Sequence, residues 1–370
     1  MPEYRVALFD GLAHERELDI FVQASDCLGK DVSFPLNVAQ HDYSHKMIKC
    51  CHFPLLWQRG LHLCRVQKRG DVLVVCGDLH QVSTIPLILY AKWKGAGVVW
   101  WGHHVSARPK EFFVRIRLAI AKALADCMLC YTDQGRDFLL KRGFKPERVF
   151  ATGNTIDLDK VEHASNGWTQ EALGVFKNDH GLSGEHVLLF SSVLRRKTRL
   201  DVLLKALAAL RKNKRSIKFV IIGDGEMWDE YQCLAKTLNV DDQIIWVGAL
   251  RDQQELAPWF LSASAFVYPG PIGLSLIHAF SYGLPVIVND NVRNHGPEYV
   301  VFSTGENGWT FHENCSEDLA RVIEQALETP ERLKRMGEHG KQVVFQNYSM
   351  GRMVERFKEA VLGCSAIKAR

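Results

Sequence analysis

The chain has 370 residues and a formal net charge of +4, with 47% hydrophobic and 24% charged residues. This composition excludes widespread disorder, and the length is sufficient for two domains of ordinary size. The basic excess lies in residues 1–165, which hold 22 Lys and Arg against 18 Asp and Glu, because the remainder holds 24 of each. An excess this mild is too small for a nucleic-acid binder, so we expect no nucleic-acid partner.

The chain also lacks the sequence signs of secretion and of a membrane span. No apolar run is long enough to cross a bilayer, and Asp10 interrupts the short apolar run at the start, so we expect a cytoplasmic protein. The ten cysteines are scattered, without the spacing of a disulfide framework. Cys127 and Cys130 have CxxC spacing within an apolar run, which we interpret as a buried strand whose two sulfurs point to opposite faces.

The first half alternates short apolar runs with amphipathic stretches, which predicts a parallel sheet covered by helices. Strands are predicted at 4–9, 32–36, 71–76, 97–101, 127–132 and 148–152, and helices at 45–68, 82–94, 109–123 and 134–142. A polar stretch that extends to residue 181 predicts a linker. The helix near 110–122 is basic on its outer side; packing on the sheet is the favoured interpretation, and docking on a membrane is the alternative.

The second half repeats the alternation, so the fold class is α/β with two doubly wound, Rossmann-like domains facing a central cleft. Strands are predicted at 187–191, 218–222, 244–247, 265–268 and 286–288. Helices are predicted at 200–212, 228–238, 253–262, 275–282, 317–328, 332–346 and 350–361. The expected domains are residues 1–165 and 166–347, followed by a terminal segment at 348–370.

The turn from Pro269 to Gly273 is the strongest candidate for an anion site. It follows a predicted strand and leads into a helix, so unpaired backbone N–H groups at a positive helix end would face a phosphate. An ordinary strand-to-helix turn is the alternative. The basic run Arg195–Arg199 follows the first strand of the second half, where it would neutralise a diphosphate, or else form a solvated loop.

Two strand ends of the first half carry further candidates. His103 and His104 follow the strand predicted at 97–101, where a histidine would hydrogen-bond a polar ligand or serve a structural role. Gly11 and His14 follow the strand predicted at 4–9. We interpret them as acceptor-side contacts, with a plain loop as the alternative.

Several short motifs, in this order and spacing, resemble the family-4 glycosyltransferases, which have the two-domain GT-B fold. They are Trp101–His103, Gly153–Asp157, Ile221–Gly225, Val247–Leu250, Gly273–Ala279, Gly283–Ile287, His295–Glu298 and Glu306–Gly308. The resemblance implies transfer of a sugar from a nucleotide-sugar to a hydroxyl of a glycan or lipid-linked acceptor, with retained anomeric configuration and no metal or other cofactor. It also implies a final helix that crosses back to the first domain.

The resemblance assigns roles to particular residues. Gly273, Leu274 and Ser275 would hold the donor diphosphate with Arg196 and Lys197. Gly248 would also lie in the donor site, and His103 would contact the donor sugar. Two glutamates that the family usually carries are replaced by Gly270 and His278, although His278 still offers a hydrogen bond to a ribose hydroxyl. A variant subgroup is therefore favoured; a nucleotide-sugar epimerase or hydrolase and a non-catalytic binding subunit are the alternatives.

Overall fold

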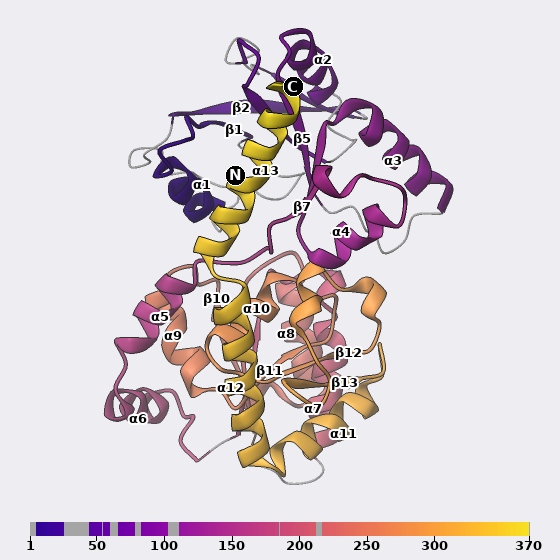
Figure 1. Ribbon diagram of the computed structural model, residues 1–370. Coiled ribbons are helices and arrows are strands. Elements are labelled where there is room, and N and C mark those ends of the chain that lie inside the picture. Colours follow the sequence, from indigo (N-terminus) through magenta and orange to yellow (C-terminus); the bar gives the residue numbers. More distant parts are fainter. Residues whose placement is uncertain are drawn as a thin grey trace. The chain divides into compact units, whose positions relative to one another are not determined.

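The structure is a computed structural model that describes residues 5–25, 44–53, 55–59, 66–77, 83–102, 111–184, 186–211 and 217–369 (Figure 1). It divides into two compact units. The first contains residues 1–156 together with 348–370, and the second contains residues 157–347. The last helix, α13 (Met350–Ala369), therefore packs within the first unit although it follows the second along the chain.

The first unit is built on a four-stranded parallel sheet. The strands β4 (Val72–Cys76), β5 (Gly97–Gly102), β6 (Cys127–Cys130) and β7 (Val149–Ala151) lie in chain order. The helices between them are α2 (Thr84–Trp93), α3 (Glu111–Leu124) and α4 (Asp133–Leu140). Right-handed connections between neighbouring strands place these three helices on one face of the sheet.

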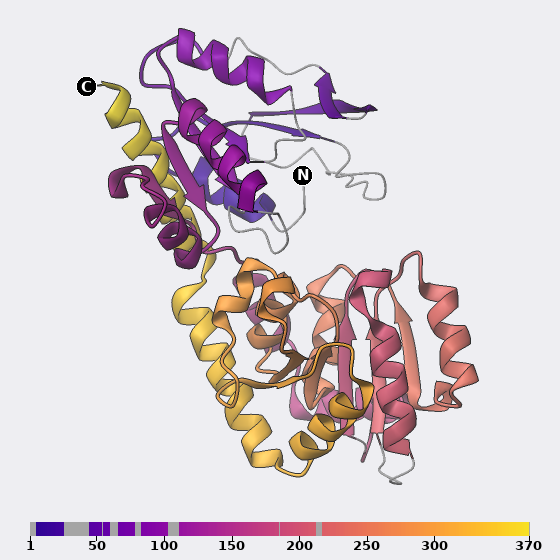
Figure 2. The ribbon, with the colours of Figure 1, turned by 90° about the vertical axis from the view of Figure 1, so that its right-hand side faces the viewer.

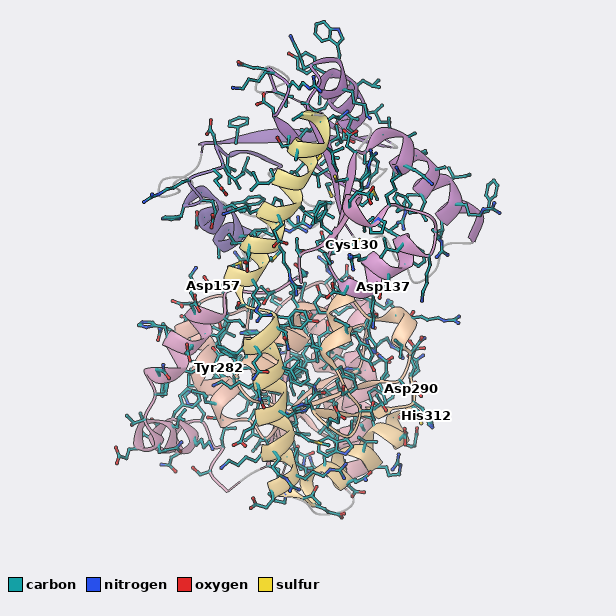
Figure 3. The ribbon with its side chains drawn as sticks, in the orientation of Figure 1. Cys130, Asp137, Asp157, Tyr282, Asp290 and His312 are labelled. Carbon is teal, nitrogen blue, oxygen red and sulfur yellow. The ribbon has the colours of Figure 1, made fainter. Side chains whose placement is uncertain are left out.

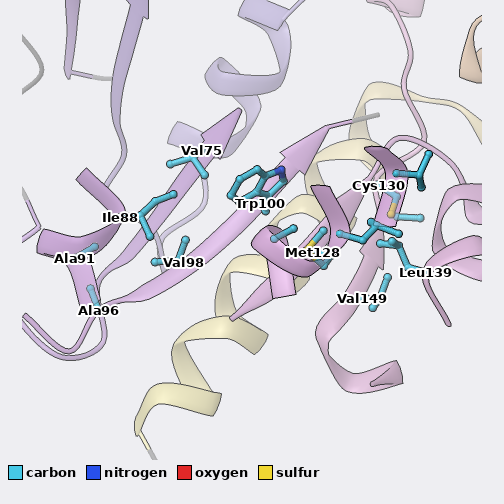
Figure 4. Packing of buried hydrophobic residues seen from close by; sticks show 14 of the residues in the cluster. Val75, Ile88, Ala91, Ala96, Val98, Trp100, Met128, Cys130, Leu139 and Val149 are labelled. Atoms are coloured by element: carbon cyan, nitrogen blue, oxygen red, sulfur yellow. The ribbon is translucent and has the colours of Figure 1, made fainter. Parts of the chain in front are cut away.

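The two faces of this sheet carry separate cores. On one face Trp100 and Met128 pack with residues of α2, α3 and α4, as Figure 4 shows for Ile88 and Leu139. On the other face Val99 and Leu129 pack against α1 (Val6–Ala13) and α13. The face that the connecting helices leave bare is thus covered by the two ends of the described chain.

Two predictions for the first unit are wrong. The segment predicted as a strand at 4–9 belongs to helix α1, whose buried Leu8 and Leu12 lie one helical turn apart against α13, so tertiary packing overrides the apolar pattern. The helix predicted at 45–68 is replaced by the antiparallel strands β2 (Ser44–Phe53) and β3 (Leu55–Arg59), with β1 (Phe21–Ser25) parallel to β2. The strand predicted at 32–36 lies outside the described residues.

The second unit contains one six-stranded parallel sheet with the order β10-β9-β8-β11-β12-β13. Its strands are β8 (His186–Ser191), β9 (Ile217–Ile222), β10 (Ile244–Gly248), β11 (Ala265–Tyr268), β12 (Val286–Asn289) and β13 (Gly308–Phe311). The helices that follow strands are α7 (Leu200–Arg211), α8 (Trp228–Thr237), α9 (Gln253–Ser262), α10 (Leu274–Ser281) and α11 (Ser316–Leu327), and α12 (Pro330–Asn347) comes last. Helices cover both faces (Figure 2).

Strand β13 was not predicted, and the predicted linker is largely helical. It contains α5 (Leu158–Asn166) and α6 (Gln170–Asp179), and both helices pack on α9. Asp157 (Figure 3) and Thr169 accept hydrogen bonds from the backbone N–H groups of Lys160 and Ala172. The polar residues that suggested a linker therefore include helix caps.

Candidate functional site

The strand order of the second unit identifies where a ligand would bind. The chain passes from β8 to β9 and β10 on one side, then returns to place β11 on the other side of β8. At such a reversal the loops after the two central strands diverge toward opposite faces, which opens a crevice at the carboxyl edge of the sheet. The loop after β8 contains the basic run Arg195–Arg199. The loop after β11 contains the predicted anion turn Pro269–Gly273, which we call the phosphate turn, so both candidates lie at this point.

These two loops are in direct contact through Gly270. A Cβ atom at Gly270 would lie 2.3 Å from the carbonyl oxygen of Lys197 and 2.8 Å from the Cα of Thr198. Because both neighbours are backbone atoms, a side chain at position 270 would displace one of the loops. The absence of a glutamate here thus has a steric reason: in this chain the loop after β11 rests on the loop after β8.

The two basic candidates extend outward from that contact. Arg196 and Lys197 form a short 3-10 turn, and both side chains are exposed. Arg196 lies 3.7 Å from the carboxylate of Glu230 in α8, a weak pair at this level of exposure. The buried Thr198 anchors the turn, because its hydroxyl donates to the carbonyl of Arg195 at 2.6 Å. The turn is held by its backbone and presents its charges to solvent.

Two buried residues that the sequence analysis did not select hold the phosphate turn from the other side. The Asn289 amide, at the end of β12, donates to the carbonyl oxygens of Pro269 and Gly270, each at 3.0 Å. His295 accepts from the N–H of Ile272 at 3.1 Å and lies 2.9 Å from the carbonyl of Asn289 through Nε2. These partners require an acceptor at Nδ1 and a proton at Nε2, so the ring is neutral, and burial lowers its pKa.

One sequence signal was available for each of these residues. Asn289 is a polar residue directly after the apolar run 286–288, and a buried asparagine needs partners for its amide. His295 begins one of the motifs that carry the family resemblance, but its position gave no indication of its partners.

The start of α10 is suited to an anion. Gly273 is the N-cap residue and, as a glycine, has no side chain that could cap the helix. Leu274 and Ser275 in the first turn are half-buried, and the Ser275 hydroxyl lies 3.5 Å from the carbonyl of Ser191. The buried Glu298 carboxylate lies beside the same turn, with Oε2 3.4 Å from the position of a Cβ at Gly273. The helix dipole stabilises negative charge at this end of α10, whether on the Glu298 carboxylate or on a bound anion.

The turns after β9 and β10 complete the carboxyl edge. The N–H of Gly223 donates to the carbonyl of Gly248 at 2.7 Å, and a Cβ at Gly223 would lie 1.8 Å from the carbonyl oxygen of Ser192. Gly248 itself has open space around it but a φ of +86°, a conformation that favours glycine. The structure therefore places Gly248 at the same edge as the phosphate turn, two strands from β8.

His278 lies one turn into α10 and faces α9. Its Nε2 is 3.0 Å from the side-chain oxygen of Gln253, which also accepts a hydrogen bond from Tyr282 at 3.0 Å. The ring of Phe260 is 4.5 Å away. Burial lowers the pKa of His278 to about 4, so the imidazole is neutral at pH 7 and donates from Nε2 to Gln253. At the position where the family resemblance leads one to expect an acid, this chain carries an uncharged ring with one nitrogen already hydrogen-bonded.

The first-half candidates are placed differently. His103 lies outside the described residues. Gly11 belongs to helix α1 and not to a strand-end turn: a Cβ there would lie 2.6 Å from Cγ2 of Val354, so close packing on α13 explains the glycine. His14 follows the same helix, with Nδ1 2.7 Å from the carbonyl oxygen of Asp10. The argument that made Gly11 and His14 acceptor contacts therefore fails, and the role itself stays a prediction.

The cysteine interpretation is confirmed. Cys127 and Cys130 are both buried in β6 but pack into the cores on opposite faces of the sheet (Cys130 is marked in Figure 3). Within the described ranges, no three His, Cys, Asp or Glu side chains gather as a metal site would require. Nor does any helix in that part of the chain have the length and apolar character to span a membrane.

Known proteins share this architecture. A model of the family described as glycosyl transferases group 1 matches residues 175–343. The putative glycosyltransferase EpsD of Bacillus subtilis is 25% identical over 244 residues, 64% of this chain and 60% of its own length. The alpha-monoglucosyldiacylglycerol synthase of Streptococcus pneumoniae is 29% identical over 173 residues, 45% of this chain and 38% of its own length. The chain thus spans less than two thirds of the length of either relative.

Likeness to solved structures extends further along the chain. HepE from Anabaena, solved in complex with UDP, superposes with a TM-score of 0.73 over 97% of this chain and 95% of that protein, at 15% identity. Identity this low establishes the fold alone. The chain therefore has the GT-B fold of two Rossmann-like units, and most of its second unit matches the group 1 glycosyl transferase family.

Proposed function

We propose that the protein is a retaining glycosyltransferase that moves a sugar from a nucleotide-sugar to a hydroxyl of a glycan or lipid-linked acceptor, in the synthesis of a surface polysaccharide or glycolipid. The observation that carries the proposal is the contact between the phosphate turn and the Lys197–Thr198 backbone at the reversal of the strand order. Two loops held together there would form a preorganised binding site for a diphosphate, next to the exposed side chains of Arg196 and Lys197.

In this proposal the charge that develops on the leaving diphosphate is stabilised by Arg196, Lys197 and the backbone N–H groups at Gly273–Ser275, without a metal ion. Since Asn289 and His295 hold the turn before any ligand binds, little reorganisation is needed at the moment of reaction. His103 would position the donor sugar. The donor phosphate would act as the base, so the mechanism needs no protein nucleophile.

The remaining donor contacts are Gly248 and His278. Gly248 would let the chain turn at the edge of the site, and Nδ1 of His278 would accept a hydrogen bond from a ribose hydroxyl while Nε2 stays with Gln253. The acceptor would be bound by the first unit, through contacts that include Gly11 and His14. We place the protein in the cytoplasm as part of this proposal, and a lipid-linked acceptor would then require its peripheral contact with a membrane.

Nucleotide-sugars with different bases and sugars, tested for thermal stabilisation and then for transfer to lipid-linked and soluble glycans, would test the proposal. UDP-sugars come first, because HepE was solved with UDP. We expect one donor to raise the melting temperature and NMR of the product to give the anomeric configuration of that donor. Product of opposite configuration would refute the retaining mechanism.

The cationic contribution is tested by Lys197→Ala, with Lys205→Ala as the matched control. Both lysines are exposed, but Lys205 lies within α7, away from the strand ends. Loss of one charge-assisted contact to phosphate should weaken UDP binding by about tenfold or more in calorimetry, and the control should bind as the wild type does. Equal affinity in both variants would contradict the role of Lys197.

A non-catalytic nucleotide-sugar-binding subunit is the second candidate, because the chain has no room for an acid at Gly270. Tight donor binding without turnover across a full acceptor panel would favour it. A nucleotide-sugar epimerase or hydrolase would instead convert the donor in the absence of any acceptor.

A further inference from the structure

The outer faces of α2 and α3 carry an unusual share of the exposed apolar side chains. Nine large hydrophobic residues are exposed within the described part of the chain, and five of them lie on these two helices. They are Ile85, Leu89, Trp93, Phe112 and Ile116. We call these five residues the apolar face. Monomeric proteins rarely leave such a group in water without a binding role.

On α2 the apolar face is a continuous row. Ile85, Leu89 and Trp93 follow one another at intervals of four residues, so they line one side of the helix, and their exposed fractions rise from 39% through 55% to 75%. The other side of the same helix is buried at Leu87, Ile88 and Ala91. The exposed apolar row is therefore separate from the buried residues that pack α2 on the sheet.

On α3 the pattern continues beside it. Phe112 and Ile116 are four residues apart and 67% and 41% exposed, while Val114 and Leu118 face the core. Because α2 and α3 pack into the same core cluster on one face of the sheet, their outer sides face the same direction. Figures 1 and 2 show the two helices as neighbours in both views.

The charges around the apolar face are mostly positive. Segments 83–102 and 111–124 contain five basic residues and a single acidic one, Glu111. Lys94 lies with its ammonium nitrogen 4.5 Å from the centre of the Trp93 ring, and Arg115 is exposed on α3. Lys92 and Lys122 are already engaged, by Asp126 at 3.7 Å and by the carbonyl of Gly143 at 3.2 Å.

We propose that the apolar face of α2 and α3 is a docking surface for a membrane that contains anionic lipid. Trp93, with a cation over its ring, matches the chemistry of the lipid headgroup region, and Ile85, Leu89, Phe112 and Ile116 match the outer acyl chains. The surrounding cations are attracted by a negative surface potential. The proposal deepens the membrane contact of the proposed function by naming its surface, but it needs no donor and no turnover.

The test is sedimentation of the full-length protein with vesicles of phosphatidylcholine alone or mixed with phosphatidylglycerol. The double variant Leu89→Glu/Trp93→Glu should lower binding to the anionic vesicles by about tenfold or more. Lys94→Glu/Arg115→Glu should lower the same binding by about threefold to tenfold and reduce its dependence on salt. Leu89, Trp93 and Arg115 are exposed and Lys94 is half-buried, and far-UV circular dichroism with melting curves checks that each variant folds.

Val175→Glu is the matched control, because Val175 is 62% exposed but lies on α6 in the second unit. It should bind vesicles as the wild type does. Wild-type protein that ignores anionic vesicles, or variants on α2 that bind them unchanged, would overturn the proposal. The proposal would also be overturned if the wild-type protein is a dimer, and the α2 variant is a monomer that binds vesicles as the wild type does. The apolar face would then join two copies of the chain. None of these outcomes affects the sugar-transfer proposal, which is read from donor turnover.

Discussion

The two units use the same strand–helix alternation but arrange it differently. In the first unit the four strands β4 to β7 lie in chain order, so α2, α3 and α4 gather on one face and the chain ends cover the other. In the second unit the order reverses between β8 and β11, and helices cover both faces. At this reversal β8 and β11 are neighbours, and the loops that follow them touch at Gly270 before they diverge. A change of strand order, not a particular motif, is therefore what creates the candidate site.

If the site depends on that loop contact, filling it should have the largest effect. Gly270→Glu, which adds the acid that the family resemblance leads one to expect, should abolish UDP binding and lower the free energy of unfolding by about 3 kcal/mol, because the new Cβ meets the Lys197 backbone. Calorimetry and urea unfolding measure the two effects. Gly174→Glu on α6, where a Cβ meets nothing within 4 Å, is the control. A Gly270→Glu protein with normal stability and increased turnover would show that the contact is not needed.

Removing the hydrogen bonds from Asn289 to the phosphate turn should have a smaller effect. Asn289→Ala removes the donor to the carbonyls of Pro269 and Gly270 and leaves them buried without that partner. We expect a loss of about 2 kcal/mol in unfolding free energy and weaker donor binding. Asn347→Ala serves as the control, since that exposed amide donates to the carbonyl of Val343 in its own helix. If donor affinity is the same in both variants, Asn289 supports the fold but not the site.

The smallest effect concerns pH. The pKa of His278 falls from 6.5 in the unfolded chain to about 4 in the fold. The unfolded chain therefore takes up the proton first, so the stability contributed by the neutral ring is complete above about pH 6.5 and is lost as pH falls toward 4. Between pH 7 and pH 5 we expect the free energy of unfolding of the second unit to fall by an amount on the order of 1 kcal/mol, and by less in His278→Phe. Urea unfolding at the two pH values measures this difference.

His312 provides a control of opposite sign. It is exposed beside Asp290, with Nδ1 2.7 Å from Oδ2 (Figure 3), and this hydrogen bond raises its pKa. Its protonated form is favoured by the fold, so its contribution is present at low pH and is lost as pH rises. His312→Gln should therefore leave the acid destabilisation intact. A loss at pH 5 that disappears in His312→Gln and persists in His278→Phe would reverse the assignment.

The difference between the units also explains which features the sequence could predict. The strands and helices of the second unit from β8 to α12 were predicted within a few residues, apart from β13. The predicted strands are mostly buried apolar runs, and the helices between them are mostly amphipathic segments. The start of the first unit was not predicted correctly. Leu8 and Leu12 pack against α13, which lies hundreds of residues later in the sequence. Helical period alone could have identified α1, but not its partner.

The site was predictable to a similar degree. The phosphate turn and the basic run were selected from their positions at strand ends, and Gly248 from the family resemblance. The structure brings all three to one edge of the sheet. The reason for Gly270 was hidden, because it depends on the backbone of a loop more than seventy residues earlier. Asn289 and His295 act through hydrogen bonds whose partners exist only after folding.

The return of α13 to the first unit has a consequence for the order of events during synthesis. Phe357, Ala360 and Cys364 cover one face of the β4–β7 sheet, and Arg69 donates to the last carbonyls of the helix at Lys368 and Ala369. These residues leave the ribosome after the whole second unit. During synthesis the β4–β7 sheet therefore keeps an uncovered apolar face until α13 is made, although the second unit can already fold. The first unit, which is synthesised first, is the last to complete its core.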